Sequence, residues 1–153
     1  MKEIADLISD VPDFPKPGIV FKDITSLLEH PTGLKLVVDA FKQRYADQGV
    51  THFAGIESRG FIFASALAHE MGVGMVLIRK PGKLPRPTHS ASYALEYGED
   101  TVHIHQDAVG AGDKVVIVDD LIATGGTAKA AADLVAMCGA EVHEIAAVIE
   151  LSF

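Results

Sequence analysis

Two adjacent carboxylates, Asp119 and Asp120, stand between a short apolar run and a loop of small polar residues. The run, Lys114 to Val118, is rich in β-branched residues, which is typical of a strand buried on both faces of a parallel sheet. The loop after the carboxylates contains Ala123, Thr124, Gly125, Gly126 and Thr127, and an alanine-rich helical pattern follows it. Backbone N–H groups and hydroxyls in such a loop can bind a phosphate monoester. The carboxylates would repel that phosphate and so must face a neutral polyol, a cation or a developing positive charge; a sugar phosphate satisfies both halves.

Polar residues also follow two earlier predicted strands, His52–Ile56 and Gly74–Ile78. The first strand is followed by Glu57, Ser58, Arg59 and Gly60, and the second by the cations Arg79, Lys80 and Lys83. Ligands of open α/β sheets bind at the carboxyl edge of the strands, so these side chains and the acid pair are expected to meet there. Arg59 before a helix N-terminus suits an anion, and the cations would balance a polyphosphate. Each group also has a simpler interpretation, as a solvated strand end or loop.

The segment VVIVDDLIATGGT resembles the phosphoribosyl pyrophosphate (PRPP) motif of type I phosphoribosyltransferases, in the form found in adenine phosphoribosyltransferases. Two further segments are similar to that family. FPKPGIVFKDI resembles its N-terminal hood over the base, and GKLPRPTHSASYALEYG resembles its catalytic flap. The resemblance spans almost the whole chain. It implies transfer of the 5-phosphoribosyl group from PRPP to adenine, a step of purine salvage that gives AMP and pyrophosphate.

The resemblance also implies a role for each candidate residue. Glu96, Asp119 and Asp120 would be catalytic, and the acid pair would hold the ribose while residues Ala123 to Thr127 hold the 5'-phosphate. Glu57 to Gly60, with Arg79, Lys80 and Lys83, would bind pyrophosphate, often with a cis peptide before Ser58 in the family. Adenine would contact Val20, Phe21, Lys22 and Tyr97. Mg2+ would be bound mainly through PRPP and water, so no protein metal ligand is predicted, and relatives are commonly homodimers.

Three features depart from the family pattern. Lys22 stands where many relatives have Arg, and Arg86 stands where Gly is common in the flap. The chain ends at Phe153, whereas family members commonly continue for another strand and loop that help to complete the base pocket. We therefore expect either a C-terminally truncated chain or a base pocket that closes differently.

Two alternatives to adenine transfer stay open at this point. One is a phosphoribosyltransferase for another purine base (hypoxanthine, guanine or xanthine), which the hood and flap segments disfavour. The other is a non-catalytic PRPP-binding regulator, which usually carries a separate binding module that a chain of 153 residues has no room for. P-loop and dinucleotide-binding readings fail because neither GxxxxGK[ST] nor GxGxxG occurs.

The pattern of predicted helices and strands indicates a single α/β domain over residues 1–153. It is expected to contain a doubly wound, mostly parallel sheet with an inserted β-hairpin flap. A helix is predicted over about the first ten residues, followed by a stiff hood segment at 12–25 that no regular element could use. The remaining expectations are helices at 31–49, 61–71 and 128–137, a surface loop at 84–92, hairpin strands at 93–97 and 102–108 within the flap 82–105, and a last strand at 142–151.

Composition limits the other function classes. A net charge of -8 argues against a general nucleic-acid binder. The chain has no apolar run of membrane-spanning length, and its acidic N-terminus is unlike a signal peptide, so a cytoplasmic protein without membrane partners is expected. The lone Cys138 is predicted to pack near a helix end. His103 and His105 alternate onto one strand face but lack a third metal ligand nearby, so a structural role is favoured over a metal site.

Overall fold

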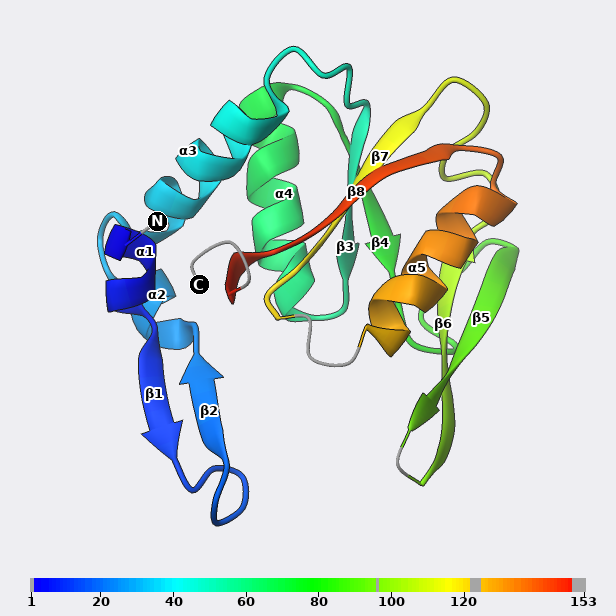
Figure 1. Cartoon of the computed structure of the whole chain (residues 1–153). Coiled ribbons are helices and arrows are strands. Elements are labelled where there is room, and N and C mark those ends of the chain that lie inside the picture. The colour runs from blue at the N-terminus through cyan, green and yellow to red at the C-terminus, as the bar shows by residue number, and fades with distance from the viewer. Residues whose placement is uncertain (1, 96, 122–124, 150–153) are drawn as a thin grey trace.

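A parallel sheet forms the centre of the computed structural model, which describes residues 2–95, 97–121 and 125–149 (Figure 1). The strand order is β4-β3-β7-β8, so the predicted central strand, β7, is indeed internal. All three neighbouring pairs are parallel. The four strands are β3 (His52–Ile56), β4 (Gly74–Ile78), β7 (Lys114–Asp119) and β8 (Glu141–Ala147). Helices cover both faces: α3 (Gly33–Tyr45) and α4 (Arg59–Met71) lie on one side, and α5 (Gly126–Met137) on the other.

The side chains of β7 alternate between two hydrophobic cores, because successive strand residues point to opposite faces. Val116 and Val118 pack in the core under α3 and α4, together with Phe63. Val115 and Ile117 belong to the core under α5. All four of these β7 residues are fully buried, which explains the uninterrupted apolar run in the sequence. The predicted doubly wound α/β fold is confirmed.

An antiparallel hairpin, β5 (Thr88–Leu95) and β6 (Gly98–His105), continues the chain between β4 and β7 (Figure 1). The predicted hairpin is therefore present, but two of its details were wrong. Residues 88–92 are strand rather than surface loop, and the predicted turn at 98–101 lies inside β6. Small residues such as Ala91 can pair here because Val102 and Ile104 of β6 are buried against α5, so packing overrides weak strand propensity.

The N-terminal region also differs from the expectation. The first helix ends at Leu7 rather than near residue 10. Segment 9–12, at the end of the predicted helix, pairs with segment 20–23 of the stretch expected to be irregular, and the two form an antiparallel hairpin. Pro12 is tolerated because it is the last residue of a strand in a two-stranded ribbon. The connecting turn uses positive φ angles at Asp13 and Gly18 and a cis Phe14–Pro15 bond. The elements are α1 (Lys2–Leu7), β1 (Ser9–Pro12), β2 (Val20–Asp23) and α2 (Thr25–Glu29).

Two other element boundaries move. The predicted helix at 31–49 begins at Gly33 and ends at Tyr45; a Cβ at Gly33 would lie only 1.8 Å from the Leu27 carbonyl oxygen, so glycine permits the tight junction between α2 and α3. The last strand ends at Ala147 rather than 151, and residues 150–153 lie outside the described chain. Among the described helices, none is long and apolar enough to cross a membrane.

Candidate active site

The polar segments after β3 and β7 leave the sheet side by side. The two strands pair in parallel up to Gly55 and Val118, so loop 57–60 and the acid pair emerge at the same edge. A cavity of about 330 Å3 lies there. It is lined by Ile56, Glu57, Ser58, Arg59, Lys80, Tyr93, Val102, Asp119, Asp120, Leu121 and Thr127. Seven of the residues singled out from the sequence thus line this one cavity, Lys80 among them.

Asp120 is paired with Arg59 across this cavity. The Asp120 side chain is almost completely buried, and its Oδ2 lies 2.5 Å from Nε of Arg59. The Arg59 side chain is 53% exposed. A single guanidinium therefore neutralises the buried carboxylate and still presents N–H donors to anything that enters from solvent.

Asp119 titrates near neutral pH in this arrangement. Its Oδ1 accepts a 2.8 Å hydrogen bond from the backbone N–H of Asp120. Burial, reinforced by the neighbouring Asp120 side chain, raises the pKa of Asp119 to about 7, and Arg59 only partly offsets this rise. A carboxyl that accepts or loses a proton near pH 7 can adapt its charge to a bound ligand.

This shift predicts a pH-dependent stability. The pKa of Asp119 rises on folding from an ordinary value of 3.8 to about 7, so its contribution is present at low pH and lost as pH rises through about 7. The free energy of unfolding of the unliganded chain should fall by about 2 kcal/mol between about pH 5 and about pH 8. Urea denaturation at several pH values measures this, and Asp119→Asn should flatten the profile. An equal slope in the variant would contradict the assignment.

The backbone of loop 57–60 lies close to the end of β7. The Glu57–Ser58 peptide is cis, as the family resemblance suggested, and Arg59 begins α4. A Cβ at Gly60 would lie 2.6 Å from the Val118 carbonyl oxygen and 3.4 Å from Oδ1 of Asp119. Only glycine allows the helix start to approach the acid pair this closely.

Gly60→Ala is therefore expected to destabilise the chain by about 1–3 kcal/mol, because the neighbour that must move is backbone of the central strand. Turnover should fall about tenfold as the loop and the acid pair separate. Thermal unfolding and steady-state kinetics measure the two effects. Gly110→Ala is the matched control, since a Cβ there meets nothing within 4 Å. Equal behaviour of the two variants would show that the close approach is unimportant.

Glu57 lines the cavity and also binds the cationic segment that follows β4. Its Oε1 accepts hydrogen bonds from Nε of Arg79 at 3.0 Å and from the backbone N–H of Lys80 at 3.1 Å. Burial alone would raise the pKa of Glu57, but these hydrogen bonds outweigh it and the pKa is lowered. The Arg79 guanidinium lies over the Phe61 ring, 5.7 Å from its centroid. Of the three predicted cations, Lys80 alone lines the cavity; Arg79 is engaged with Glu57, and Lys83 is exposed outside it.

Sequence reasoning missed Tyr93. Tyr93 lines the cavity, and its hydroxyl accepts a 3.0 Å hydrogen bond from Nζ of Lys80. Its partner across the hairpin, Asp100, is known only from the strand register. An aromatic hydroxyl opposite a carboxylate in a hairpin is the signal that could have pointed to it.

The loop predicted to bind the 5'-phosphate is described in part. Ala123 and Thr124 lie outside the described residues, as does the predicted catalytic residue Glu96. Gly125 has a positive φ of 81° and caps α5, which begins at Gly126, and Thr127 in its first turn lines the cavity. The N-terminus of a 12-residue helix thus lies at the cavity, where its N–H groups and dipole favour an anion.

The residues expected to contact the base lie elsewhere in this structure. Val20, Phe21 and Lys22 belong to β2, and none of them lines the cavity described above. Phe21 packs edge-on against Phe14, and Lys22 pairs with Asp10 at 2.6 Å. Tyr97 is 90% exposed beside the hairpin turn. The structure therefore brings seven of the predicted phosphate and ribose residues to one cavity, and none of the predicted base residues.

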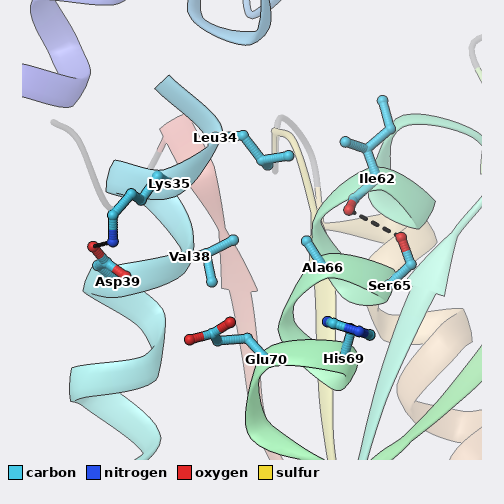
Figure 2. Close-up of a pocket in the computed structure, with 9 residues that line it drawn as sticks. All are labelled: Leu34, Lys35, Val38, Asp39, Ile62, Ser65, Ala66, His69 and Glu70. Carbon is cyan, nitrogen blue, oxygen red and sulfur yellow. Dashed lines mark hydrogen bonds and ion pairs between the residues drawn. The ribbon is translucent and has the colours of Figure 1, made fainter. Parts of the chain in front are cut away.

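A second, larger groove of about 710 Å3 runs between α3 and α4 (Figure 2). Its floor is apolar, and its rim carries ionic groups that are paired with one another: Lys35 with Asp39, and Glu70 with Lys42. None of its lining residues follows the carboxyl end of a strand. They are Leu34, Lys35, Val38, Asp39, Ile62, Ser65, Ala66, His69 and Glu70. The polar residues that follow strand ends are thus gathered in the smaller cavity.

The histidines of β6 are occupied by neighbours within the hairpin region. His103 Nδ1 lies 3.1 Å from the Thr88 hydroxyl, and His105 Nε2 accepts a hydrogen bond from the Arg86 backbone N–H. No group of three or more His, Cys, Asp or Glu side chains in the described residues is arranged to hold a metal ion.

Known proteins share both the sequence and the fold. The phosphoribosyl transferase domain profile matches residues 23–151. An adenine phosphoribosyltransferase from Cyanothece is 54% identical over 97% of this chain and 88% of its own length. The crystal structure of the enzyme of that name from Thermoanaerobacter pseudethanolicus superposes with a TM-score of 0.88 at 48% identity, covering 94% of this chain and 83% of the other. That from Saccharomyces cerevisiae, complexed with an imino-altritol bisphosphate and adenine, has a TM-score of 0.88 at 39% identity, with 94% and 84% coverage.

Proposed function

Because the chain belongs to the phosphoribosyl transferase domain family, we propose that it transfers the 5-phosphoribosyl group from PRPP to adenine, giving AMP and pyrophosphate. The observation that carries this proposal is one cavity in which three carboxylates, two cations and a helix N-terminus converge. Its relatives at about half sequence identity bear the name of this activity.

The acid pair suits the ribose. Transfer from PRPP passes through a ribosyl centre with oxocarbenium character, so negative charge near the ring stabilises the transition state more than the ground state. Asp119 and Asp120 would accept hydrogen bonds from the ribose hydroxyls. Asp120 is ionically paired with Arg59, and Asp119 can be ionised or protonated near pH 7, so the pair need not carry two full charges before substrate arrives.

Positive groups on either side of the acid pair suit the two phosphate ends. Arg59 and Lys80 reach the cavity from loop 57–60 and from the end of β4, where they would bind the leaving pyrophosphate. Glu57 would act indirectly, by holding Arg79 and the Lys80 backbone. The loop at Ala123–Thr127 would hold the 5'-phosphate with backbone N–H groups at the start of α5.

The base would be bound as the flap and hood close. We propose that Val20, Phe21 and Lys22 of the hood and Tyr97 of the flap contact adenine, and that Glu96 shares or supplies a proton at its N7 during attack through N9. The exposure of Val20 and Tyr97, 57% and 90%, supports this, since large apolar surface left open on two hairpins is available to cover a ligand.

Mg2+ is proposed as the metal. Mg2+ would reach the site on the oxygens of PRPP, so it would not depend on a cluster of protein ligands. When bound, Mg2+ supplies positive charge to the leaving pyrophosphate. Arg59 and Lys80 would supply the remainder from the protein, and the acid pair would face the ribose.

The decisive experiment is a product assay. The purified chain, incubated with adenine, PRPP and Mg2+, is expected to form AMP and pyrophosphate in equal amounts, measured by chromatography and a coupled pyrophosphate assay. Asp119→Asn/Asp120→Asn is the control that should lose activity while remaining folded by circular dichroism. Tight PRPP binding without any nucleotide product from a panel of purine bases would favour a regulator instead.

We also propose a cytoplasmic homodimer. Two large apolar side chains, Ile62 on α4 and Leu77 on the edge strand β4, are 37% and 39% exposed, and a second copy would cover them. Light scattering at micromolar concentration is expected to give twice the 16.3 kDa mass of one chain. A monomer mass throughout that range would contradict the dimer.

A further inference from the structure

Two residues of the β5–β6 hairpin bind the side-chain ammonium of Lys80. Nζ of Lys80 lies 2.6 Å from Oδ2 of Asp100 and 3.0 Å from the Tyr93 hydroxyl. Tyr93 and Asp100 stand directly opposite each other across the hairpin, and the Tyr93 hydroxyl also donates to the same carboxylate at 3.3 Å. Hydrogen bonds to Asp100 and Tyr93 raise the pKa of Lys80 to about 12. The Lys80 ammonium, the Tyr93 hydroxyl and the Asp100 carboxylate are thus hydrogen-bonded to one another in a closed triangle.

Lys80 links this triangle to the cavity. Its backbone N–H donates to Glu57, which fixes the residue beside loop 57–60. The base of the hairpin is anchored separately, by two backbone hydrogen bonds between Arg79 and His103 of 3.0 and 2.8 Å. Asp100 lies nearer to the hairpin turn than this anchor. The Lys80 side chain is therefore a contact between the cavity and the outer half of the hairpin.

We propose that Asp100 and Tyr93 are positioning residues that compete with pyrophosphate for Lys80, so that binding of the polyphosphate transfers Lys80 from the hairpin to the ligand. The inference rests on the proposed function, which gives the cavity its polyphosphate. A carboxylate 2.6 Å from an ammonium cancels much of its attraction for an approaching anion. The pair is accessible, since the two side chains are 41% and 32% exposed, so a ligand can replace Asp100 without a large rearrangement.

The exchange has a directional consequence. While Lys80 is held by Asp100, the outer half of the hairpin is tied to the wall of the cavity. Once pyrophosphate takes Lys80, that tie is gone, and Tyr93 keeps only its packing against the core under α5. Binding at the phosphate subsite and the position of the hairpin are then thermodynamically linked. The reason is that the contact between Lys80 and Asp100 exists only while the subsite is empty.

Asp100→Asn tests the competition. Asn keeps the size of the side chain and removes its charge, so magnesium pyrophosphate, titrated calorimetrically into the purified chain, should bind about three- to tenfold more tightly than to wild type. Glu99→Gln is the matched control: it removes the same charge from the neighbouring exposed residue and should change affinity by less than about twofold at physiological salt. Unchanged or weaker binding to Asp100→Asn would overturn the proposal.

A double-mutant cycle isolates Lys80 as the mediator. Lys80→Met keeps most of the apolar stem, removes the ammonium and should weaken pyrophosphate binding. In that background Asp100→Asn is expected to have no further effect, and Tyr93→Phe in the wild-type background should tighten binding in the same direction as Asp100→Asn but less. An effect of Asp100→Asn that persists in Lys80→Met would overturn the exchange. If the cycle behaves as expected but no AMP is formed from adenine and PRPP, the proposed activity fails and the exchange stands.

Discussion

Adenine is expected to be used about 10^4-fold more efficiently than hypoxanthine, as measured by kcat/KM with PRPP and Mg2+. The two bases present opposite patterns: adenine offers an amino donor and a ring acceptor where hypoxanthine offers a carbonyl acceptor and a ring N–H donor. A pocket built to hydrogen-bond one pattern leaves buried groups unpaired with the other, and that cost accounts for the discrimination.

Guanine is the second comparison, because it shares the carbonyl and ring N–H of hypoxanthine and should be rejected similarly. Product identity is checked by chromatography, so that slow formation of IMP or GMP is not mistaken for AMP. Values of kcat/KM for hypoxanthine within about tenfold of those for adenine would rule out the adenine assignment and favour a broader purine phosphoribosyltransferase.

Arg59→Ala is expected to lower kcat/KM for PRPP by about 10^2- to 10^3-fold, the effect of removing one charged donor from a developing anion. The structure adds a second cost, because the buried Asp120 loses its cation, with Nε and Oδ2 only 2.5 Å apart. The variant should therefore also unfold at a lower temperature at neutral pH.

Arg59→Lys separates these two costs. Lysine restores a positive charge beside Asp120 but not the planar fork of donors, so thermal stability should recover while kcat/KM recovers only in part. Lys35→Ala, on the distant α3–α4 groove, controls for loss of a surface cation that is paired at 2.9 Å with Asp39. If Arg59→Ala and Lys35→Ala had the same kinetics, Arg59 would be a structural residue only.

Much of the fold could be predicted because the strands are short apolar runs with polar ends. The predicted bounds of β3 and β4 agree with the structure to the residue. β7 is one residue longer than predicted, because it includes Asp119. The same logic failed where packing, not local pattern, decides. Segment 88–92 has weak strand propensity and becomes a strand because β6 is buried beside it. The prolines near Pro12 favoured an irregular segment, where the structure has a hairpin.

The site was predictable to the extent that it follows strand ends. Loop 57–60 and the acid pair meet because β3 and β7 are neighbours, an adjacency that parallel α/β logic favours. The pairing of side chains within the site could not be predicted. Glu57 turning to Arg79, and Lys80 turning to Asp100, depend on backbone geometry that brings together residues about 20 positions apart. The roles of the individual residues stay predictions.

The two-sided burial of β7 has a consequence for how the chain opens. Because its side chains belong to both hydrophobic cores, β7 cannot separate from one of them while staying native in the other. Opening of that strand is therefore a global event rather than a local one. The carboxylates at the end of β7 stay in register as long as the chain is folded at all. Any rearrangement that leaves the fold intact must therefore occur outside β7, and the acid pair at its end serves as a fixed reference.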